Sequence, residues 1–337
     1  MDFSPSVLLV TGGAGFIGSN FVRHVLKTTP DAIVVTLDKL TYAGSIHNLD
    51  DLPDRERHTF VEGDINDRGL VEKLLREHEI DTIVHFAAET HVDRSIAGPG
   101  DFIASNVQGT YNLLESARSV WLLENRWDEH ACRFHHISTD EVYGSLGPDD
   151  APFTESSLYA PNSPYSASKA ASDHMVRAWH HTYGLPVTTS NCSNNYGPYQ
   201  HDEKLIPTVI RSCLNQSQIP VYGDGSNVRD WLYVDDHCRG VLACIRLGKL
   251  GEAYNFGGLF ERANIDIVRD ICRLMDEKKP MAVKHESLIQ FVSDRPGHDW
   301  RYAIAVAKAA RELEWTPSES FESGIEKTVS WYLRRSG

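Results

Sequence analysis

Groups that transfer protons are concentrated in one short span near the middle of the chain. They are a hydroxyl, two adjacent carboxylates, a phenol and an amine, carried by Thr139, Asp140, Glu141, Tyr165 and Lys169. Tyr165 and Lys169 stand four positions apart, so on a helix their side chains share one face. The Lys169 ammonium can then stabilise a Tyr165 phenolate, which is able to take a proton from an alcohol. Taken alone, the same pair is also common on ordinary amphipathic helices.

An earlier segment carries a glycine pattern typical of dinucleotide-binding proteins. Residues 7–11 form a continuous apolar run, as expected of a strand buried on both faces. Gly12, Gly15 and Gly18 follow, and a helical pattern of apolar residues comes next. Such glycines allow a tight turn, close approach of backbone N–H groups to a pyrophosphate, and close helix packing. The strand before them and the helix after them supply the context that a glycine pattern alone lacks.

The residue that ends the second predicted strand selects the dinucleotide. Residues 33–37 form this strand, and Asp38 follows it, twenty residues after Gly18. A carboxylate there accepts hydrogen bonds from both ribose hydroxyls and repels a 2′-phosphate, so NAD is favoured over NADP. The alternative is an aspartate that merely starts a loop.

A tyrosine acts as a base near neutral pH only when its pKa is strongly lowered. The ordinary pKa is near 10, and lowering it by roughly 3 units requires about 4 kcal/mol of preferential stabilisation of the anion. A close cation in a shielded site, helped by a positively charged nicotinamide ring, can supply most of this energy. We therefore expect Lys169 to lower the pKa of Tyr165.

Alternating strand and helix patterns organise the whole chain. They predict strands over residues 7–11, 33–37, 59–61, 80–86, 134–137 and 186–190. They predict helices over residues 102–119, 163–183, 205–214 and 321–332, and a surface insertion over residues 121–130. The fold class is therefore α/β, a Rossmann-type doubly wound parallel sheet with a smaller, mixed α/β C-terminal lobe. We expect residues 1–190 to form the NAD-binding domain with the catalytic residues, and residues 191–337 to form mainly the substrate-binding lobe, with some interleaving.

Composition disfavours several classes of partner and site. The formal net charge of −14 argues against nucleic acid and anionic membranes. The chain has no run of about 18 apolar residues and no signal-peptide pattern, so we expect a cytoplasmic protein. Six scattered cysteines without a C-x-x-C pair predict reduced, mostly buried thiols and no metal site. The pairs at 135–136 and 180–181 are expected to be packed or solvated histidines, because adjacent side chains point apart.

Several short motifs resemble a known enzyme family. The pattern over 12–18 and the pair of Tyr165 and Lys169 are similar to those of the extended short-chain dehydrogenase/reductase superfamily. Within it, the chain resembles the dTDP-glucose 4,6-dehydratases over nearly its whole length. The motifs that carry this resemblance are TDEVYG at 139–144, NNYGPY at 194–199, YGDG at 222–225 and RPGHD at 295–299. The acidic pair in the first motif is the most specific, because related 4-epimerases lack it.

The resemblance implies a redox-neutral dehydration of a nucleotide sugar, dTDP-glucose. Tyr165 would remove the proton of the sugar 4-hydroxyl while hydride passes from C4 to NAD, and Thr139 would hydrogen-bond the same oxygen. Glu141 would then abstract the acidified C5 proton, and Asp140 would protonate the C6 hydroxyl so that it leaves as water. The hydride returns to C6, so NAD is regenerated in each cycle and should stay tightly bound.

This assignment makes one carboxyl an acid and its neighbour a base, although both begin near pKa 4. Two adjacent carboxyls in a desolvated site cannot both ionise at low cost, so one is expected to hold its proton near neutrality. Because adjacent side chains diverge on a strand, we expect the strand to end by about Thr139 and both carboxyls to converge on the sugar.

The contacts implied by the resemblance extend over most of the chain. The cofactor contacts, with the glycines of the motif included, are Gly12, Gly15, Phe16, Ile17, Gly18, Asp38, Lys39, Leu40, Thr41, Asp64, Ile65, Phe86, Ala87, Ala88, Thr90, Ser105, Tyr165, Lys169 and Asn195. The nucleotide-sugar contacts are Thr90, Thr139, Asn194, Lys204, Leu205, Pro220, Tyr222, Arg229, Asn264, Asp294, Arg295 and His298. Arg229 and His298 can neutralise a diphosphate, and Tyr222 offers a flat face to a pyrimidine.

Three alternatives stay open on the sequence. A UDP-hexose 4,6-dehydratase differs only in the base, and one methyl group is worth roughly 1–3 kcal/mol in a pocket. A 4-epimerase or a decarboxylase shares the hydride transfer but has no use for the pair of Asp140 and Glu141. A non-catalytic NAD-binding protein has no need for a complete set of proton-transfer groups. The family also implies a homodimer, formed through the helices predicted over 102–119 and 163–183.

Overall fold

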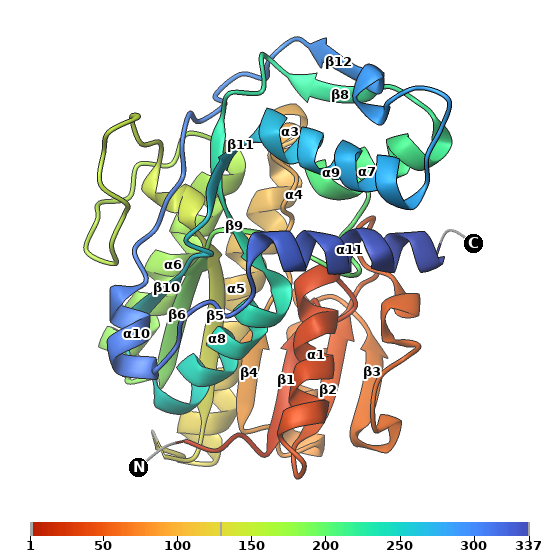
Figure 1. Cartoon of the computed structure of the whole chain (residues 1–337). Helices are drawn as coiled ribbons and strands as arrows, with labels where there is room; N and C mark the ends of the chain where they lie inside the picture. The colour runs from red at the N-terminus through yellow and green to blue at the C-terminus, as the bar shows by residue number, and fades with distance from the viewer. Residues whose placement is uncertain (1–2, 129, 336–337) are drawn as a thin grey trace.

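The computed structural model describes residues 3–128 and 130–335, and a seven-stranded parallel sheet forms its centre (Figure 1). The strands lie in the order β10-β6-β5-β4-β1-β2-β3. Their bounds are β1 Val7–Thr11, β2 Ile33–Asp38, β3 His58–Glu62, β4 Thr82–His85, β5 Arg133–Thr139, β6 Val187–Cys192 and β10 Ala253–Phe256. Every neighbouring pair in this sheet is parallel. The carboxyl ends of all seven strands therefore meet at one edge.

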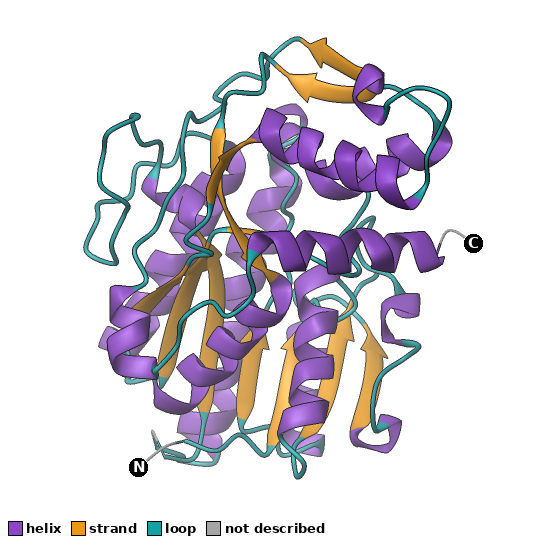
Figure 2. Cartoon of the chain, viewed as in Figure 1, coloured by secondary structure: helices purple, strands orange, loops and turns teal. Residues whose placement is uncertain are grey.

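Helices cover both faces of the sheet (Figure 2). Helices α1 (Phe16–Thr28) and α8 (Val234–Leu247) pack on one face and share a core with it. Helices α2 (Arg68–Glu77), α5 (Gly109–Ala117) and α6 (Pro164–Tyr183) pack on the other face. The arrangement is the doubly wound sheet that the sequence predicts, and the fold class is confirmed.

Alternation along each strand sends neighbouring residues into these two cores. Leu8 and Val10 of β1 pack in the core of α1 and α8, whereas Leu9 between them packs in the core of α2, α5 and α6. All three side chains are fully buried. A strand covered on both faces has to be apolar throughout, which explains the continuous apolar runs in the sequence.

A smaller lobe lies over the carboxyl ends of the sheet (Figure 1). It holds a mixed three-stranded sheet in the order β11-β9-β7 and a parallel pair, β12 with β8. The bounds of the lobe elements are β7 Asn194–Tyr196, β8 Ile219–Tyr222, β9 Val228–Tyr233, β11 Glu261–Ala263, β12 Ile289–Val292, α7 Leu205–Asn215, α9 Asn264–Lys278 and α11 Phe321–Arg335. The apolar faces of α7, α9 and α11 share one core, to which Ile206, Ile267 and Phe321 contribute.

One strand of the main sheet is not predicted by the sequence. Strand β10 has only four residues, too few to show a pattern, and it lies far along the chain from its partner β6. Helices α8 and α10 (Ala307–Leu313) contribute to the core around it. The chain beyond residue 190 therefore returns to the main sheet.

The prediction of a surface insertion over residues 121–130 is wrong for its first residues. Helix α5 is extended by π-helical turns over Ile103–Gln108 and Arg118–Glu124. Trp121 is fully buried in the second of these, and its Nε1 donates to the carbonyl of Ile80 at 2.8 Å. Trp121 lies in the short apolar run of residues 120–123, which continues the helix and not a surface loop. After the helix the chain is mostly exposed, and residue 129 lies outside the described residues.

The cysteines and histidines occupy ordinary structural positions. All six cysteines are free and buried, as the sequence predicts. His135 and His136 are buried in β5 and bind Thr188 at 2.8 Å and Asp173 at 3.1 Å, respectively. Across residues 3–128 and 130–335, no group of three or more His, Cys, Asp or Glu side chains is arranged to hold a metal ion. Within the same ranges no helix is long and apolar enough to cross a membrane.

Candidate active site

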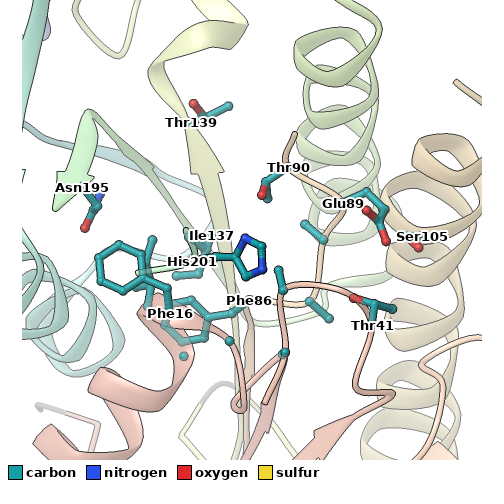
Figure 3. Close-up of a pocket in the computed structure, with 18 of the residues that line it drawn as sticks. Phe16, Thr41, Phe86, Glu89, Thr90, Ser105, Ile137, Thr139, Asn195 and His201 are labelled. Carbon is teal, nitrogen blue, oxygen red and sulfur yellow. The ribbon is translucent and has the colours of Figure 1, made fainter. Parts of the chain in front are cut away.

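A cavity opens at the carboxyl ends of the strands, and the predicted site residues gather around it. Its walls come from the loops after β1 to β4, from the end of β5, from α6 and from residues 192–204. Figure 3 shows side chains from both parts of the chain around this space, among them Phe16, Thr139, Asn195 and His201. The predicted residues that line it are Gly12, Gly15, Phe16, Ile17, Gly18, Asp38, Lys39, Thr41, Asp64, Ile65, Phe86, Ala87, Ala88, Thr90, Ser105, Thr139, Asp140, Glu141, Tyr165, Lys169, Asn194, Asn195 and Lys204.

The glycine loop brings bare backbone to the floor of this cavity. Gly12 has a φ of +69°, and a Cβ added to it would lie 2.6 Å from the backbone nitrogen of Ala87. A Cβ added to Gly18 would lie 2.3 Å from the carbonyl oxygen of Gly12. Helix α1 begins directly after Gly15, and no side chain caps its first N–H groups. Uncapped N–H groups beside a loop without side chains fit the pyrophosphate of a dinucleotide.

Asp38 ends β2 at the same edge, with its carboxylate largely buried. Oδ2 accepts from the backbone N–H of Ala14 at 3.0 Å, and Oδ1 accepts from that of Leu40 at 2.9 Å. Burial raises the pKa of Asp38, and these two N–H groups oppose the rise. A carboxylate with acceptor capacity to spare beside the glycine loop fits the ribose hydroxyls of NAD. Leu40 itself is not among the lining residues, so only its backbone supports this site.

Tyr165 and Lys169 project from the first turns of α6. Ser163 forms a capping box with Ser166, and Pro164 occupies the first helical position, so the start of the helix is well defined. Both side chains are buried and line the cavity. The Lys169 Nζ donates to the carbonyl of Ile137 at 2.7 Å. The helix thus places the phenol and the amine on one face, as the spacing predicts.

Burial acts on the pKa of Tyr165 in the direction opposite to that expected from Lys169. Burial raises it well above its ordinary value, the nearby Glu141 carboxylate adds to the rise, and a hydrogen bond with Thr139 opposes it. Burial also lowers the pKa of Lys169. Within the protein alone burial thus raises the Tyr165 pKa, and the lowering that we expect from Lys169 together with a nicotinamide ring stays a prediction. Ionisation of this phenol depends strongly on every positive charge kept close to it.

Strand β5 ends at Thr139, as predicted, and one 3₁₀ turn follows over Asp140–Tyr143. The Thr139 hydroxyl caps this turn by accepting from the N–H of Glu141 at 3.3 Å. The turn removes the alternation of a strand, and both carboxyls line the same cavity. The Asp140 side chain is buried, and its Oδ2 has no hydrogen-bond partner among the described residues.

The two adjacent carboxyls have different electrostatic surroundings. Burial, and then the Glu141 and Asp230 carboxylates, raise the pKa of Asp140 well above its ordinary value. Burial also raises the pKa of Glu141, but three cations oppose this rise. These cations are Arg295, Lys204 and Arg229. Neighbouring carboxylates thus favour the protonated form of Asp140, whereas three cations favour the ionised form of Glu141, which suits one carboxyl to donate a proton and the other to accept one.

The other predicted substrate residues belong to the lobe and lie outside the cavity lining. They are Leu205, Pro220, Tyr222, Arg229, Asn264, Asp294, Arg295 and His298. Some of them contact α3 (Val92–Ala97) across the space between lobe and sheet. The Tyr222 hydroxyl donates to Oδ2 of Asp93 at 3.3 Å, and Arg295 lies 3.8 Å from Oδ1 of Asp93. Arg295 also acts electrostatically on Glu141, so this part of the lobe lies close to the cavity.

Arg229 and His298 differ in the groups that their side chains bind. Arg229 is buried, and its guanidinium donates to the backbone carbonyls of Val228, Asp299 and Trp300. Neutral carbonyls leave the positive charge available to an anion. His298 instead lies 2.6 Å from a carboxylate oxygen of Asp294, which matches its charge when it is protonated.

Sequence reasoning missed several residues of the cavity. They are Leu37, Ala43, Gly44, Gly63, Ile137, Cys192, Ser193, Gln200, His201 and Glu203. Cys192 ends β6 at the binding edge and Ser193 follows it, a position that could have identified both. His201 and Glu203 belong to a lobe loop that carries no such signal, and the hydroxyl of Tyr42 donates to Glu203 at 3.3 Å.

Comparison with known proteins gives one consistent family. A family model described as GDP-mannose 4,6 dehydratase matches residues 9–328. The dTDP-glucose 4,6-dehydratase of Neisseria meningitidis serogroup B is 54% identical over 330 residues, which cover 97% of this chain and 93% of that protein. The dTDP-glucose 4,6-dehydratase of Xanthomonas campestris pv. campestris is 57% identical over 329 residues, which cover 96% of this chain and 92% of that protein.

Solved structures agree with this result. A dTDP-glucose 4,6-dehydratase from Streptomyces venezuelae, solved with NAD bound, has a TM-score of 0.89 and 46% identity over 98% of both chains. One from Bacillus anthracis in complex with NAD has a TM-score of 0.86 and 42% identity over 97% of this chain and 96% of that one. A UDP-glucose 4-epimerase from Thermotoga maritima has a TM-score of 0.85 but 25% identity, over 98% of this chain and 100% of that one. Epimerases and dehydratases share the fold, and the sequence is more similar to the dehydratases.

Proposed function

Because the chain belongs to the GDP-mannose 4,6-dehydratase family and is similar throughout to dTDP-glucose 4,6-dehydratases, we infer that it catalyses their reaction. It is an NAD-dependent hydro-lyase that converts dTDP-glucose to dTDP-4-keto-6-deoxyglucose and water. The assignment of catalytic residues rests on one observation: Asp140 and Glu141 line the same cavity as Thr139 and Tyr165.

The residues at the foot of the cavity would hold the dinucleotide. NAD, when bound, takes up hydride from C4 of the sugar and returns it to C6. Gly12 and Gly18 leave room for the pyrophosphate, and Asp38 would accept from the ribose hydroxyls. Ala87 and Ala88 end the strand β4 region with small side chains, against which a flat ring can lie.

Tyr165 and Thr139 would act on the sugar 4-hydroxyl. Tyr165 would take the proton of this hydroxyl as C4 is oxidised, and Thr139 would hydrogen-bond the same oxygen. Lys169 lies one helical turn from Tyr165, where its charge would stabilise the phenolate. The resulting 4-ketone makes the C5 proton acidic.

Glu141 and Asp140 would carry out the elimination of water. Glu141, with three cations opposing the rise of its pKa, would be ionised and take the C5 proton. Asp140, whose pKa lies well above its ordinary value, would hold a proton and give it to the departing C6 hydroxyl. As hydride returns to C6, Glu141 would give a proton back to C5, and the proton that Tyr165 took from the 4-hydroxyl would balance, through solvent, the one that Asp140 lost to water.

The lobe would bind the nucleotide part of the substrate. Arg229 and Arg295 would neutralise the diphosphate, and Tyr222 would offer its ring to the pyrimidine. The proximity of Arg295 and Tyr222 to Asp93 supports this proposal, because it puts them at the passage between lobe and sheet.

The proposed reaction is tested by incubating the purified protein with dTDP-glucose in deuterated water, without added NAD, and reading the product by mass spectrometry. We expect a product lighter by one water that carries deuterium at C5, because solvent supplies the proton at the acidified carbon. Turnover without added NAD is expected because the cofactor is regenerated in each cycle.

Other outcomes separate the alternatives. A product of unchanged mass whose nuclear magnetic resonance spectrum is that of the C4 epimer would indicate a 4-epimerase, and loss of carbon dioxide from a nucleotide-uronic acid would indicate a decarboxylase. Turnover of UDP-hexoses but not of dTDP-glucose would show that the substrate carries uracil and not thymine. If NAD is bound but no nucleotide hexose is converted, the result would indicate a non-catalytic NAD-binding protein.

We also propose a homodimer in the cytoplasm, with two domains that divide near residue 190. Ile103 and Tyr111 of the α5 segment and Tyr183 of α6 expose apolar surface, which supports pairing of these helices with those of a second copy. Six free, buried thiols suit a reducing compartment. Light scattering after gel filtration should give twice the mass of the chain, and a monomer would contradict the pairing.

A further inference from the structure

A buried carboxylate that the proposed reaction does not use lies directly beside the catalytic helix face. Asp173 stands one turn beyond Lys169 on α6, just as Lys169 stands one turn beyond Tyr165. The exposed fraction of Asp173 is 6%, and that of Lys169 is 4%. A charged group that far from water needs a reason for its position.

Three groups orient the Asp173 carboxylate. The Ser138 hydroxyl donates to Oδ2 at 2.7 Å and the Tyr159 hydroxyl donates to the same oxygen at 2.9 Å. Nε2 of His136 lies 3.1 Å from Oδ1. An ionised carboxylate has no proton to give, so Nε2 of a neutral His136 donates here. This set of donors favours the negative form of Asp173.

Lys169 depends on that negative charge. Its Nζ donates to the neutral carbonyl of Ile137, which does not compensate a positive charge. Burial lowers the pKa of Lys169, and the Asp173 carboxylate is the largest influence in the opposite direction. Loss of the Asp173 charge would therefore favour neutral Lys169, which cannot stabilise the phenolate of Tyr165.

We propose that Asp173 is a positioning residue for this reaction: its charge keeps Lys169 in the ammonium form opposite Tyr165. Its bond to Ser138 also holds the end of β5, where Thr139 enters the cavity. The proposal rests on the proposed function, because Tyr165 needs the ammonium only if it acts as the base.

The substitution Asp173→Asn tests this role, because it keeps the size of the side chain and removes its charge. At pH 8 we expect kcat for dTDP-glucose to fall by about 10-fold to 100-fold, within the ~10²–10⁴ that general-base catalysis contributes. The KM should change by less than about 2-fold, because Asp173 does not line the cavity. The rising limb of kcat against pH should move about one unit higher, since the phenol of Tyr165 becomes harder to ionise.

Other ionisable groups that face Asp173 can also contribute to the pH dependence of kcat. They are His136 of β5, Tyr143 of the turn after it, Tyr159 of the loop before α6, and Lys169 and His174 of α6. Burial raises the pKa of Asp173 itself to about 6, so at pH 8 the wild-type carboxylate is ionised. Measuring at pH 8 and above therefore isolates the effect on Lys169 and Tyr165.

Tyr159→Phe is the matched control, because it removes one hydrogen bond to Asp173 and leaves the carboxylate in place. We expect its kcat to stay within about 3-fold of wild type, with the same pH limb. An unchanged kcat in Asp173→Asn would overturn the proposal. So would an equal loss in both variants without movement of the limb, which would mean that the site serves only packing.

A second readout does not depend on turnover. Nuclear magnetic resonance of protein with labelled lysine side chains follows the ionisation of Lys169, identified by its loss in Lys169→Met. We expect this ionisation at lower pH in Asp173→Asn than in wild type, and an unchanged value would contradict the proposal. A wild-type protein that fails to turn over dTDP-glucose would refute the proposed function, while the lysine titration would still decide whether Asp173 maintains the ammonium.

Discussion

At the residue scale, the chemistry depends on giving two adjacent carboxyls opposite tasks. Asp140 is buried, with an oxygen that no described residue binds, whereas three cations act on Glu141. Sequence position alone does not separate them, since both begin near pKa 4. Their difference comes from the charges around each side chain: the Glu141 and Asp230 carboxylates beside Asp140, and Arg295, Lys204 and Arg229 beside Glu141.

Removing either carboxyl should interrupt the reaction at a different point. Asp140→Asn should lower kcat by about 10²-fold to 10⁴-fold, because no acid remains for the C6 hydroxyl. Glu141 is intact in this variant, so dTDP-glucose recovered from deuterated water should carry deuterium at C5. Glu141→Gln should lose turnover to a similar extent and show no such exchange. Deuterium in both variants, or in neither, would contradict the assigned roles.

A buried histidine predicts how stability depends on pH. Nδ1 of His237 lies 2.9 Å from the Asn195 amide oxygen, and burial lowers the pKa of this histidine to about 3. The unfolded chain binds a proton near pH 6.5, so below that pH it binds more protons than the folded chain. This group therefore lowers the free energy of unfolding as pH falls, by about 1.4 kcal/mol per unit between pH 6 and pH 4.

The His237→Asn variant isolates this effect. Urea unfolding of wild type and variant at pH 8, 6, 5 and 4 should give a stability difference that moves in favour of the variant as pH falls. The buried carboxyls titrate in both proteins and cancel in the comparison. Parallel pH dependences would show that His237 has the same pKa in the folded and the unfolded protein.

At the element scale, the contact of α1 with the end of β1 sets the shape of the dinucleotide site. Gly18 sits in the first turn of α1 against the backbone of Gly12, with no space for a side chain. Gly18→Ala should therefore push the helix away from the loop, lower stability by about 1–3 kcal/mol and weaken NAD binding by at least about 10-fold. The bound NAD of the purified protein and its thermal unfolding measure the two effects.

Gly100→Ala is the control for that substitution. Gly100 begins the short helix α4 (Gly100–Phe102), and a Cβ added there meets nothing within 4 Å. The exchange should leave bound NAD unchanged. Equal retention of NAD in both variants would show that the loop adapts and that the close approach at Gly18 does not shape the site.

The elements that the sequence predicts are those whose pattern is local. Residues 7–11 form an apolar run between a turn and a helix, and Thr139 precedes a turn, so both strands are found at their predicted places. Strand β10 has four residues and a partner more than sixty positions away, and Trp121 donates to the carbonyl of Ile80, which lies on a distant segment. Their burial comes from packing of distant segments, which periodicity cannot reveal.

The same limit applies to the site. The glycine loop and the span around Tyr165 are continuous in the chain and were identified. Nothing in the sequence distinguishes Asp173 from other polar residues of a helix, because its partners Ser138 and Tyr159 lie on other segments. The contacts of Asp93 with the lobe were equally hidden.

At the scale of the whole molecule, the lobe and the sheet are joined through shared cores. Helix α8 packs on the sheet through Val241 and Ile245, and its Cys244 shares a second core with Leu232 of the lobe strand β9. Ile245→Ala should therefore cost about 2–5 kcal/mol and lower the unfolding midpoint of the sheet and of the lobe together. Leu247→Ala at the exposed end of α8 should cost less than about 1 kcal/mol. Separate transitions in Ile245→Ala would mean that the two parts unfold independently.

The edge position of β10 has a consequence for synthesis of the chain on the ribosome. Strand β6 is complete at Cys192, but the strand that covers its free edge begins only at Ala253. At about 5–20 residues per second, translation leaves this edge open for roughly 3–12 seconds. An uncovered strand edge readily pairs with another chain. Nascent chains on neighbouring ribosomes of one messenger are therefore exposed to mispairing during this interval, and a chaperone that binds between the completion of β6 and of β10 would protect them most.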